Sequence, residues 1–368
     1  MRVICQDCRT ETDFDPRRYR CECGGPWEPP RALDFDADQI NTSESSLWRY
    51  KKLLNDPFFS ESVYLAAGWT PILTADWGGA AVLFKLEYLA PTGSFKDRGT
   101  EVEMTYLKAA GVENVVEDSS GNAGASMAAY AARAGLNAGI YAPESASPAK
   151  LIQIEVYGAR LHSIPGPRIE ATRAVLATVD QGAVYASYAY NPVYALGQQT
   201  FAWEIWEQTG GDLPDAVVVP AGQGGLLLGA WFGFLRLLNA GLIKKIPRLF
   251  SAQSAFVAPI SKAFHNASED ISPVEPNGVS IAEGIAITRP VRGRRILEAL
   301  RESGGGAIDL SEAEIRAAYQ SLAHMGIFAE PTSAVAAAAV SHIRADIGAD
   351  ARVLVGLSGS GLKSPGIQ

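Results

Sequence analysis

The sequence predicts an α/β protein with doubly wound parallel sheets, and three observations support this fold class. Short β-branched runs alternate with longer helical stretches after about residue 80. The apolar runs are continuous, which is typical of parallel strands that helices cover on both faces. The chain has 368 residues and is 47% hydrophobic, so it is long enough for two domains of this kind.

The expected elements follow one another in a regular order. We expect strands at 81–86, 115–117, 139–142, 160–164, 216–220, 248–252 and 352–357, and helices at 123–134, 148–157, 169–179, 196–207 and 226–239. Ligands bind at the carboxyl ends of such strands, beside helix N-termini. The residues that follow each strand are therefore the candidates for a functional site.

Composition excludes several classes of function. The net charge of −8, from 32 basic and 40 acidic residues, argues against a nucleic-acid partner. No apolar run approaches the ~20 residues of a membrane helix, and we expect neither a signal peptide nor a membrane partner. All four cysteines lie within the first 23 residues, which favours a reducing, cytoplasmic location over a disulfide scaffold. Only four histidines are present, which argues against a histidine-based triad or metal site.

The loop after the first strand contains the most informative lysine. Pro91 and Gly93 favour a loop, and Ser94 is expected to cap a helix that starts near Phe95. Lys96 then lies in the first helical turn, where the helix dipole disfavours a cation. Such a lysine is either neutral or paired with an anion, and both states suit an amine that forms an imine with a carbonyl group.

Two alternatives remain open for the lysines of this region. Lys96 could be a surface residue that pairs with Asp97 or Glu101. Lys85 is a second candidate for an imine-forming amine, but it lies within a strand and is expected to pair with Glu87.

The second strand, 115–117, runs into a loop of small residues at 119–126. Small residues let a ligand approach the backbone, and the free amides at the helix start can bind a carboxylate. Asn122 offers a neutral hydrogen bond that could face an aromatic hydroxyl group. An ordinary tight turn that Asn122 caps is the alternative interpretation.

The third loop has the composition of a phosphate-binding turn. A buried strand is followed by glycines and the start of a helix, which together favour anion binding. A dinucleotide site would need an acidic residue about 20 positions later, but the next strand ends near Gln253 without one. No Lys-Ser or Lys-Thr pair follows the glycines, so a single phosphomonoester fits best. The alternative is that the glycines serve only helix–strand packing. The residues concerned are Gly222, Gln223, Gly224, Gly225 and Leu226.

The last strand ends at Ser358, whose hydroxyl group could hydrogen-bond a ring nitrogen without protonating it. A polar C-terminal turn is the alternative. Together the four loops supply an imine-forming amine, a partner for a ring hydroxyl, a phosphate nest and a partner for a ring nitrogen. These are the four groups that pyridoxal phosphate requires.

Five stretches resemble the motifs of threonine synthases, which are fold-type-II pyridoxal-phosphate enzymes related to serine/threonine dehydratases and the tryptophan synthase β chain. They are PTGSFKDRG at 91–99, SGNAGA at 120–125, GQGG at 222–225, GIFAEPTSA at 326–334 and LSGSGLK at 357–363. The resemblance covers nearly the whole chain in order. It implies two doubly wound domains, pyridoxal phosphate as cofactor, a small amino acid as substrate, and a homodimer.

The resemblance also implies a role for each site residue. Lys96 would bind the cofactor covalently and then move the substrate α-proton, Asn122 would contact the 3′-oxygen, and Ser358 would meet the pyridine nitrogen. Gly222, Gln223, Gly224, Gly225 and Leu226 would hold the phosphate. The expected substrate-binding residues are Ser119, Ser120, Gly121, Ala123 and Tyr194. Glu283 and Glu330 could lie near the site or act as buried structural carboxylates.

The first residues resemble the small cysteine knuckle that precedes many threonine synthase-like chains. Cys5, Cys8, Cys21 and Cys23 suit tetrahedral zinc in a structural role, and a metal-free remnant stays open because the second pair is C-x-C. The expected domains are residues 1–28 as the knuckle, 29–95 with 195–368 as the larger cofactor-binding domain, and 96–194 as a smaller mobile domain.

The chain departs from the family pattern at four positions that would supply phosphate donors. Ala123 stands in place of a threonine, Tyr194 of an arginine, Gln199 of a lysine and Gly225 of an asparagine. A buried phosphate dianion without these donors is costly. We therefore expect a lyase or synthase that carries out β-elimination or β-replacement on a small amino acid.

Several alternatives to this function are retained. One is a genuine threonine synthase that uses O-phosphohomoserine, and another is a serine/threonine or diaminopropionate ammonia-lyase. A non-enzymatic binding protein and a nucleotide-dependent oxidoreductase belong to other classes. The complete set of loops argues against the binding protein, and the missing acidic ribose partner argues against the oxidoreductase.

Overall fold

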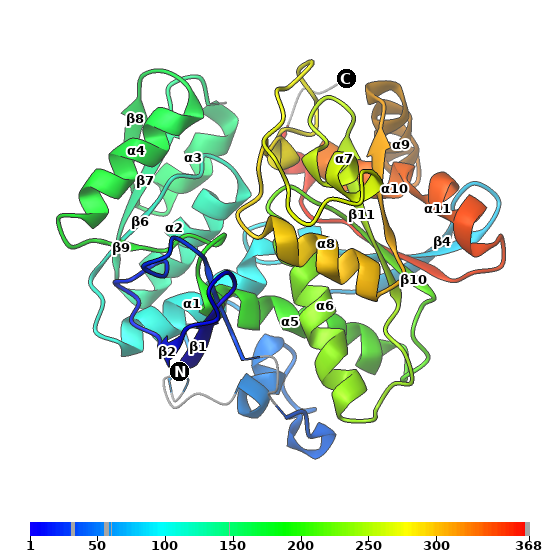
Figure 1. Cartoon of the computed structure of the whole chain (residues 1–368), viewed down its shortest axis with the longest axis horizontal. Helices are drawn as coiled ribbons and strands as arrows, with labels where there is room; N and C mark the ends of the chain where they lie inside the picture. The colour runs from blue at the N-terminus through cyan, green and yellow to red at the C-terminus, as the bar shows by residue number, and fades with distance from the viewer. Residues whose placement is uncertain (31–33, 55–58, 60, 147, 365–368) are drawn as a thin grey trace. The chain divides into compact units, whose positions relative to one another are not determined.

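The computed structural model describes residues 1–30, 34–54, 59, 61–146 and 148–364, and Figure 1 shows the chain. The fold divides into two compact units. The first comprises residues 1–68 and 90–198, and the second comprises 69–89 and 199–368. The predicted α/β class with parallel sheets is confirmed. The units are defined by packing alone, and the predicted domain scheme stays a prediction. Among the described residues, no helix is both long and apolar enough to cross a membrane.

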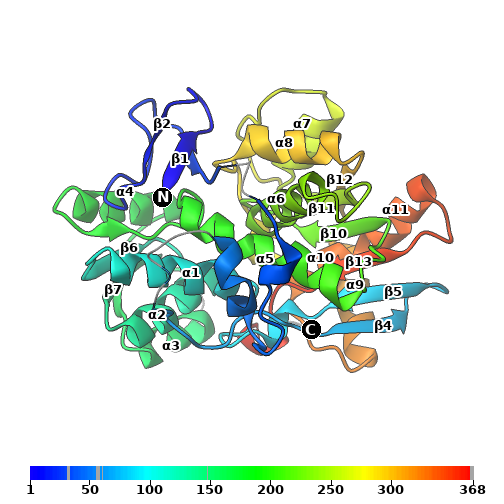
Figure 2. The same ribbon diagram turned by 90° about the horizontal axis from the view of Figure 1, so that it is seen from below.

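The first unit contains a four-stranded parallel sheet with the order β8-β7-β6-β9. Its strands are β6 (Asn114–Glu117), β7 (Asn137–Pro143), β8 (Arg160–Ile164) and β9 (Val184–Tyr185). Its helices are α1 (Lys96–Ala109), α2 (Asn122–Ala134), α3 (Pro148–Val156) and α4 (Arg168–Val179). Figure 2 shows α4 on one side of this sheet and α2 and α3 on the other, which is the doubly wound arrangement.

The same unit begins with a small antiparallel sheet of order β2-β1-β3. Its strands are β1 (Arg2–Cys5), β2 (Glu11–Asp13) and β3 (Trp27–Glu28), and the short helices η1 (Ala37–Gln39) and η2 (Leu47–Leu54) follow. These strands have two to four residues each, too few for a periodic pattern, so they were not predicted from the sequence.

The second unit contains a six-stranded sheet with the order β12-β11-β10-β13-β5-β4. Neighbouring strands are parallel except at the edge, where β4 and β5 form an antiparallel hairpin. Gly78 and Gly79 have positive φ angles in its turn. The strands are β4 (Ile72–Asp76), β5 (Ala81–Lys85), β10 (Ala216–Pro220), β11 (Arg248–Ser254), β12 (Gly306–Leu310) and β13 (Val353–Gly356).

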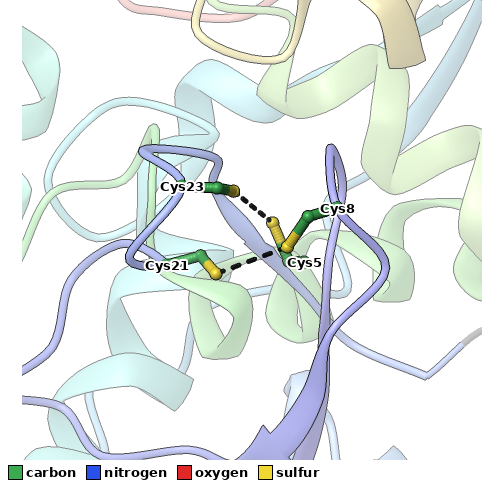
Figure 3. Close-up of side chains that lie close together, drawn as sticks. All are labelled: Cys5, Cys8, Cys21 and Cys23. Atoms are coloured by element: carbon green, nitrogen blue, oxygen red, sulfur yellow. Dashed lines mark hydrogen bonds between the residues drawn. The ribbon is translucent and has the colours of Figure 1, made fainter.

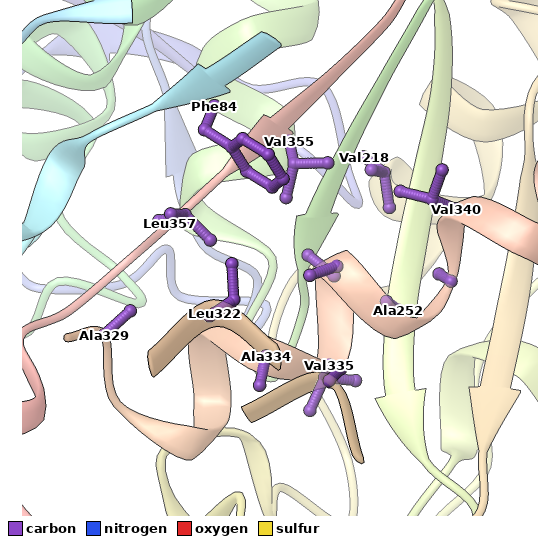
Figure 4. Close-up of a cluster of buried hydrophobic side chains, with 14 of the residues drawn as sticks. Phe84, Val218, Ala252, Leu322, Ala329, Ala334, Val335, Val340, Val355 and Leu357 are labelled. Carbon is purple, nitrogen blue, oxygen red and sulfur yellow. The ribbon is translucent and has the colours of Figure 1, made fainter. Parts of the chain in front are cut away.

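Helices cover both faces of this sheet; Figure 2 shows α7 and α8 on one side and α9 on the other. Buried side chains such as Phe84, Val218, Leu322 and Val355 form the core between the sheet and α9 and α10 (Figure 4). The helices are α6 (Gly225–Asn239), α7 (Pro259–His265), α8 (Gly293–Glu302), α9 (Glu312–His324), α10 (Pro331–Ala338) and α11 (Val340–Ile347), with the short helices η4 (Glu87–Leu89), η5 (Glu283–Ile285) and η6 (Gly361–Lys363). Helix α5 (Pro192–Gln208) contains the boundary between residues 198 and 199.

Candidate active site

Lys96 is the first residue of α1, and its side chain is partly exposed. Its Nζ lies 3.5 Å from the centroid of the Tyr188 ring and 4.8 Å from that of Phe95. A cation over an aromatic face is stabilised by about 0.5–2 kcal/mol. Burial raises the pKa of the Tyr188 hydroxyl to about 12, and the positive charge of Arg168 opposes this shift. Tyr188 was missed at the sequence level, because it lies far along the chain from Lys96 and no motif links the two.

Asp97, the neighbour of Lys96, holds the loop that precedes α1. Its carboxylate accepts hydrogen bonds from the Thr92 backbone amide at 2.7 Å, from Thr92 Oγ1 at 2.6 Å and from Ser126 Oγ at 2.7 Å. The last bond ties α1 to α2. Asp97 therefore has a structural role of its own next to the lysine.

The expected cap of α1 was wrong, and Lys85 has a partner that the sequence did not predict. Phe95 is the N-cap residue and makes no side-chain cap bond, whereas Ser94 is fully buried with its Oγ unpartnered within the described part of the chain. Lys85 forms a fully buried ion pair with Glu204 at 2.9 Å, a partner that was not predicted, and the expected pair with Glu87 stays a prediction. The expected pair relied on closeness in the sequence, but Glu204 reaches Lys85 only through the tertiary fold.

The loop between β6 and α2 begins with Ser119, whose Oγ accepts a bond from the Gly121 amide at 3.4 Å. Helix α2 begins at Asn122, with Gly121 as the N-cap residue. A Cβ at Gly124 would lie 1.9 Å from the Ser119 carbonyl oxygen, so the loop can close over the helix start only with glycine there. Since first-turn amides lack acceptors within a helix, this end of α2 can bind a carboxylate.

Two acidic residues come directly before this loop. Asp118 accepts hydrogen bonds from Tyr185 Oη at 2.7 Å and Thr172 Oγ1 at 2.5 Å. Glu117 is 1% exposed, and its Oε1 has no hydrogen-bond partner among the described residues. Burial, above all, raises the pKa of Glu117 well above its ordinary value. A strand that ends in two acids before a glycine turn was visible in the sequence, but the burial of Glu117 was not.

Tyr194 lies in the first turns of α5 and is 1% exposed. Its ring packs on the backbone of α1, where a Cβ at Gly99 would lie 2.4 Å from the ring. The Tyr194 ring centroid is 5.9 Å from that of Tyr188. Its hydroxyl has no hydrogen-bond partner in the described structure, and burial raises its pKa well above the ordinary value. The first unit thus brings Tyr194 and Tyr188 close to the helix that carries Lys96.

In the second unit, the glycine loop connects β10 to α6, which begins at Gly225. Gly224 has a φ of +74°, and a Cβ there would lie 2.5 Å from Ile296. A Cβ at Gly222 would lie 3.0 Å from the Ile285 backbone. Only glycine fits these positions, and the first-turn amides through Leu226 remain available to an anion. The Gln223 side chain accepts a bond from the Val291 amide at 2.8 Å, which fixes the loop.

Ser358 follows β13 in the same unit and is 1% exposed. Its Oγ lies 3.2 Å from Ser333 Oγ and donates to Glu330 Oε1 at 3.3 Å. Glu330 is therefore a buried neighbour of Ser358, whereas Glu283 is exposed. The donor set fits pyridoxal phosphate, because the chain offers an amine, a glycine-lined anion nest and a neutral hydroxyl group at strand ends.

Residues 63–359 match the family model described as pyridoxal-phosphate dependent enzyme. Threonine synthase of Methanocaldococcus jannaschii is 35% identical over 98% of this chain and 92% of its own length. Threonine synthase of Methanosarcina acetivorans is 32% identical over the same shares of the two chains. The chain belongs to the threonine synthase family of pyridoxal-phosphate-dependent enzymes.

Solved structures support the fold of this threonine synthase family member. Serine racemase from Dictyostelium discoideum superimposes with a TM-score of 0.67 and 26% identity, covering 79% of this chain and 92% of that one. A threonine deaminase covers the same shares with a TM-score of 0.69 and 26% identity. The predictions of a fold-type-II enzyme with pyridoxal phosphate as cofactor are therefore confirmed.

The family member also carries a cysteine cluster beside its first strand, shown in Figure 3. The Sγ atoms of Cys5, Cys8, Cys21 and Cys23 lie within 4.8 Å of one another. The Cys5–Cys23 and Cys8–Cys21 Sγ distances are 3.4 and 3.6 Å, and all four cysteines are free thiols. Thiolates around a tetrahedral zinc with bonds of about 2.3 Å lie about 3.8 Å apart. The cluster therefore has the ligand type and the spacing of a structural zinc site.

Proposed function

We propose that this enzyme carries out β-elimination or β-replacement on a small amino acid that lacks a phosphate group. The observation that carries the proposal is Tyr194, a buried neutral residue whose hydroxyl group is unpartnered in the described structure. A phosphate dianion requires several donors, preferably an arginine. The threonine deaminase similarity supports elimination, whereas the threonine synthases favour O-phosphohomoserine as the alternative substrate.

The proposed roles follow the position of each residue. Lys96 attaches the cofactor and moves the α-proton, and Ser119, Ser120, Gly121 and Ala123 bind the substrate carboxylate with their backbone or hydroxyl groups. Asn122 and Ser358 hold the ring, and Gly222, Gln223, Gly224, Gly225 and Leu226 hold the phosphate. Pyridoxal phosphate, when bound, accepts the electron pair that the α-proton leaves behind. Tyr194 would face the substrate side chain.

Substrate competition tests this proposal directly. The holoenzyme should form keto acid and ammonia from serine, threonine or 2,3-diaminopropionate, or transfer a nucleophile to them, and act poorly on O-phosphohomoserine. Efficient threonine formation from O-phosphohomoserine would contradict the proposed substrate class while leaving the cofactor chemistry in place.

The role of Lys96 has its own test. Lys96→Ala should remove the absorption band of the covalently held cofactor and all turnover, because no other amine replaces it. Lys108→Ala, on the exposed last turn of the same helix, is the matched control and should keep both. A Lys96→Ala protein that retains the band would rule out this assignment.

We further propose that Cys5, Cys8, Cys21 and Cys23 bind one structural zinc ion, that the enzyme is a homodimer, and that it works in the cytoplasm. Their arrangement leaves no ligand position open, so a catalytic role for the metal is not proposed. Elemental analysis should find about one zinc per chain, and Cys21→Ser should lose it. Zinc content unchanged by Cys21→Ser would contradict this site.

A further inference from the structure

Glu117 is a buried acid of the first unit with an idle carboxyl oxygen. It is the last residue of β6, two positions before the Ser119 loop, and only 1% exposed. Its Oε1 has no hydrogen-bond partner among the described residues. By contrast, Asp118 accepts bonds from two hydroxyl groups, and Glu103 accepts one from Asn191 Nδ2 at 2.6 Å. Glu101 on α1 also has one oxygen without a partner among the described residues, but its other oxygen accepts bonds from the backbone amides of Leu65 and Ala67. A buried polar atom without a partner costs stability, so a retained one suggests a ligand.

The charged groups around Glu117 come from several elements of the first unit. Lys96 on α1 and Arg168 on α4 favour the carboxylate, whereas the adjacent Asp118 and Glu103 on α1 disfavour it. Burial is the largest influence on the pKa of Glu117 and raises it well above the ordinary value of a glutamate. Besides burial, the charge of Glu117 raises the pKa of Tyr188 and of Tyr194, and the centroid of the Tyr188 ring lies 3.5 Å from Lys96 Nζ.

We propose that Glu117 is the general acid that protonates the departing β-substituent of the substrate. The inference rests on the proposed function and deepens it, since it specifies substrates with an uncharged, poor leaving group such as a hydroxyl or an amino group. Such groups leave as hydroxide or amide only with difficulty, and a positioned acid removes that barrier.

The step balances with groups already on the chain. Lys96 takes the α-proton, and the electron pair left on Cα forms a double bond to Cβ. The bond from Cβ to oxygen breaks, and its bonding pair stays on the oxygen. The Glu117 proton moves to that oxygen, and water leaves. Glu117 is then a carboxylate, which the charges of Lys96 and Arg168 favour, and the ammonium of Lys96 returns a proton to it. No oxidant, reductant or further reactant is required.

Leaving-group dependence separates this role from a structural one. The holoenzyme and the Glu117→Gln variant are compared on serine, whose hydroxyl needs a proton, and on β-chloroalanine, whose chloride does not. Glu117→Gln should lower kcat on serine about 100- to 10,000-fold and leave β-chloroalanine turnover nearly unchanged. Glu103→Gln removes another buried carboxyl of the same region and should leave the ratio of the two rates unaltered.

A second readout does not depend on turnover. The infrared carbonyl band of a protonated carboxyl group should be present in the wild-type protein near neutral pH and be diminished in Glu117→Gln. Equal losses on both substrates, or no change in that band, would overturn the role of Glu117. A wild-type enzyme that eliminates from neither substrate would overturn the proposed function itself, and this outcome is distinct from either of the former.

Discussion

Glu103 lies on helix α1, as Lys96 does, but its carboxyl group is buried and contacts the side-chain amide of Asn191. It is 1% exposed and is hydrogen-bonded by Asn191, and burial raises its pKa to about 8. An acid whose folded-state pKa lies above its unfolded value binds its proton more tightly in the folded protein. The protonated Glu103 carboxyl therefore contributes fully to the stability of the folded protein below the ordinary pKa of 4.5. This contribution is lost as the pH rises through about 8.

The raised pKa of Glu103 leads to a prediction for the pH dependence of stability in Glu103→Gln. The wild-type Tm should fall as the pH rises from about 5 to 8, because in this range the unfolded chain has released the Glu103 proton that the folded protein still holds. The variant should show a shallower fall, since glutamine keeps the hydrogen bond but does not titrate. Burial also raises the pKa of Glu101 to about 7, so the Tm of the variant should still fall with pH, but less steeply than that of the wild type. Thermal unfolding at several pH values measures this, and parallel curves for the two proteins would contradict it.

Individual site residues differ in how far sequence alone could find them. Lys96, Gly224 and Ser358 follow strands next to glycines, so local pattern pointed to them. Tyr188 and Glu117 required the fold, because cation–π contact and an orphaned oxygen depend on residues from distant parts of the chain. The same holds for Lys85, whose ion-pair partner Glu204 lies 119 positions away.

At the scale of elements, the start of α5 meets α1 at two glycines. A Cβ at Gly197 would lie 2.1 Å from the Arg98 carbonyl oxygen and 2.9 Å from Gly99 Cα. This close approach fixes the helix that carries Lys96, three residues before Gly99. Small residues therefore determine where the reactive amine can lie.

Gly197→Ala should destabilise the protein by about 1–3 kcal/mol, because the added methyl group meets backbone that cannot yield. The gain of about 1 kcal/mol from replacing glycine within a helix offsets only part of this. Gly306→Ala is the control, since its Cβ would make an ordinary 3.4 Å contact with Phe250. Urea unfolding measures the free energy of unfolding of both variants. A Gly197→Ala protein as stable as the wild type would contradict this prediction, because α1 and α5 could then move apart without loss of stability.

The strands were the most predictable elements. The ranges 160–164 and 216–220 agree to the residue with β8 and β10, and clear turn residues flank both. Strand β10 is a continuous apolar run, whereas β8 mixes polar and apolar residues. The small sheet of β1 to β3 was not predicted, since two to four residues per strand give no distinctive period. Strand β4 was also missed, and with it the β4–β5 pairing.

At the scale of the whole molecule, each unit builds its own parallel sheet and places the candidate residues at strand carboxyl ends. The order of the strands could not be read from the sequence, because β5 and β13 pair although Val82 and Val353 lie near opposite ends of the chain. The rule that ligands bind at strand ends was sufficient to find the loops without that order.

Exposed apolar side chains on the second unit support the proposed homodimer. Leu362 is 78% exposed and Phe328 is 43% exposed. The two residues are neighbours, since a Cβ at Gly361, the residue before Leu362, would lie 2.6 Å from the Phe328 ring. Exposed apolar groups that cluster often mark an interface. Light scattering should give twice the chain mass, and Leu362→Glu should shift the protein toward monomer; a monomeric wild type would contradict the proposal.

The buried pair of Lys85 and Glu204 decides which amines can be chemically modified. Lys85 Nζ is fully enclosed and donates to Glu204, to the Thr70 carbonyl at 2.5 Å and to Gln208 at 2.8 Å. An amine held by three acceptors and shielded from water has no free electron pair to offer an aldehyde. Of the two lysines that flank the first loop, only Lys96 should react with an added aldehyde, so reductive trapping should label the peptide that contains it and leave Lys85 untouched.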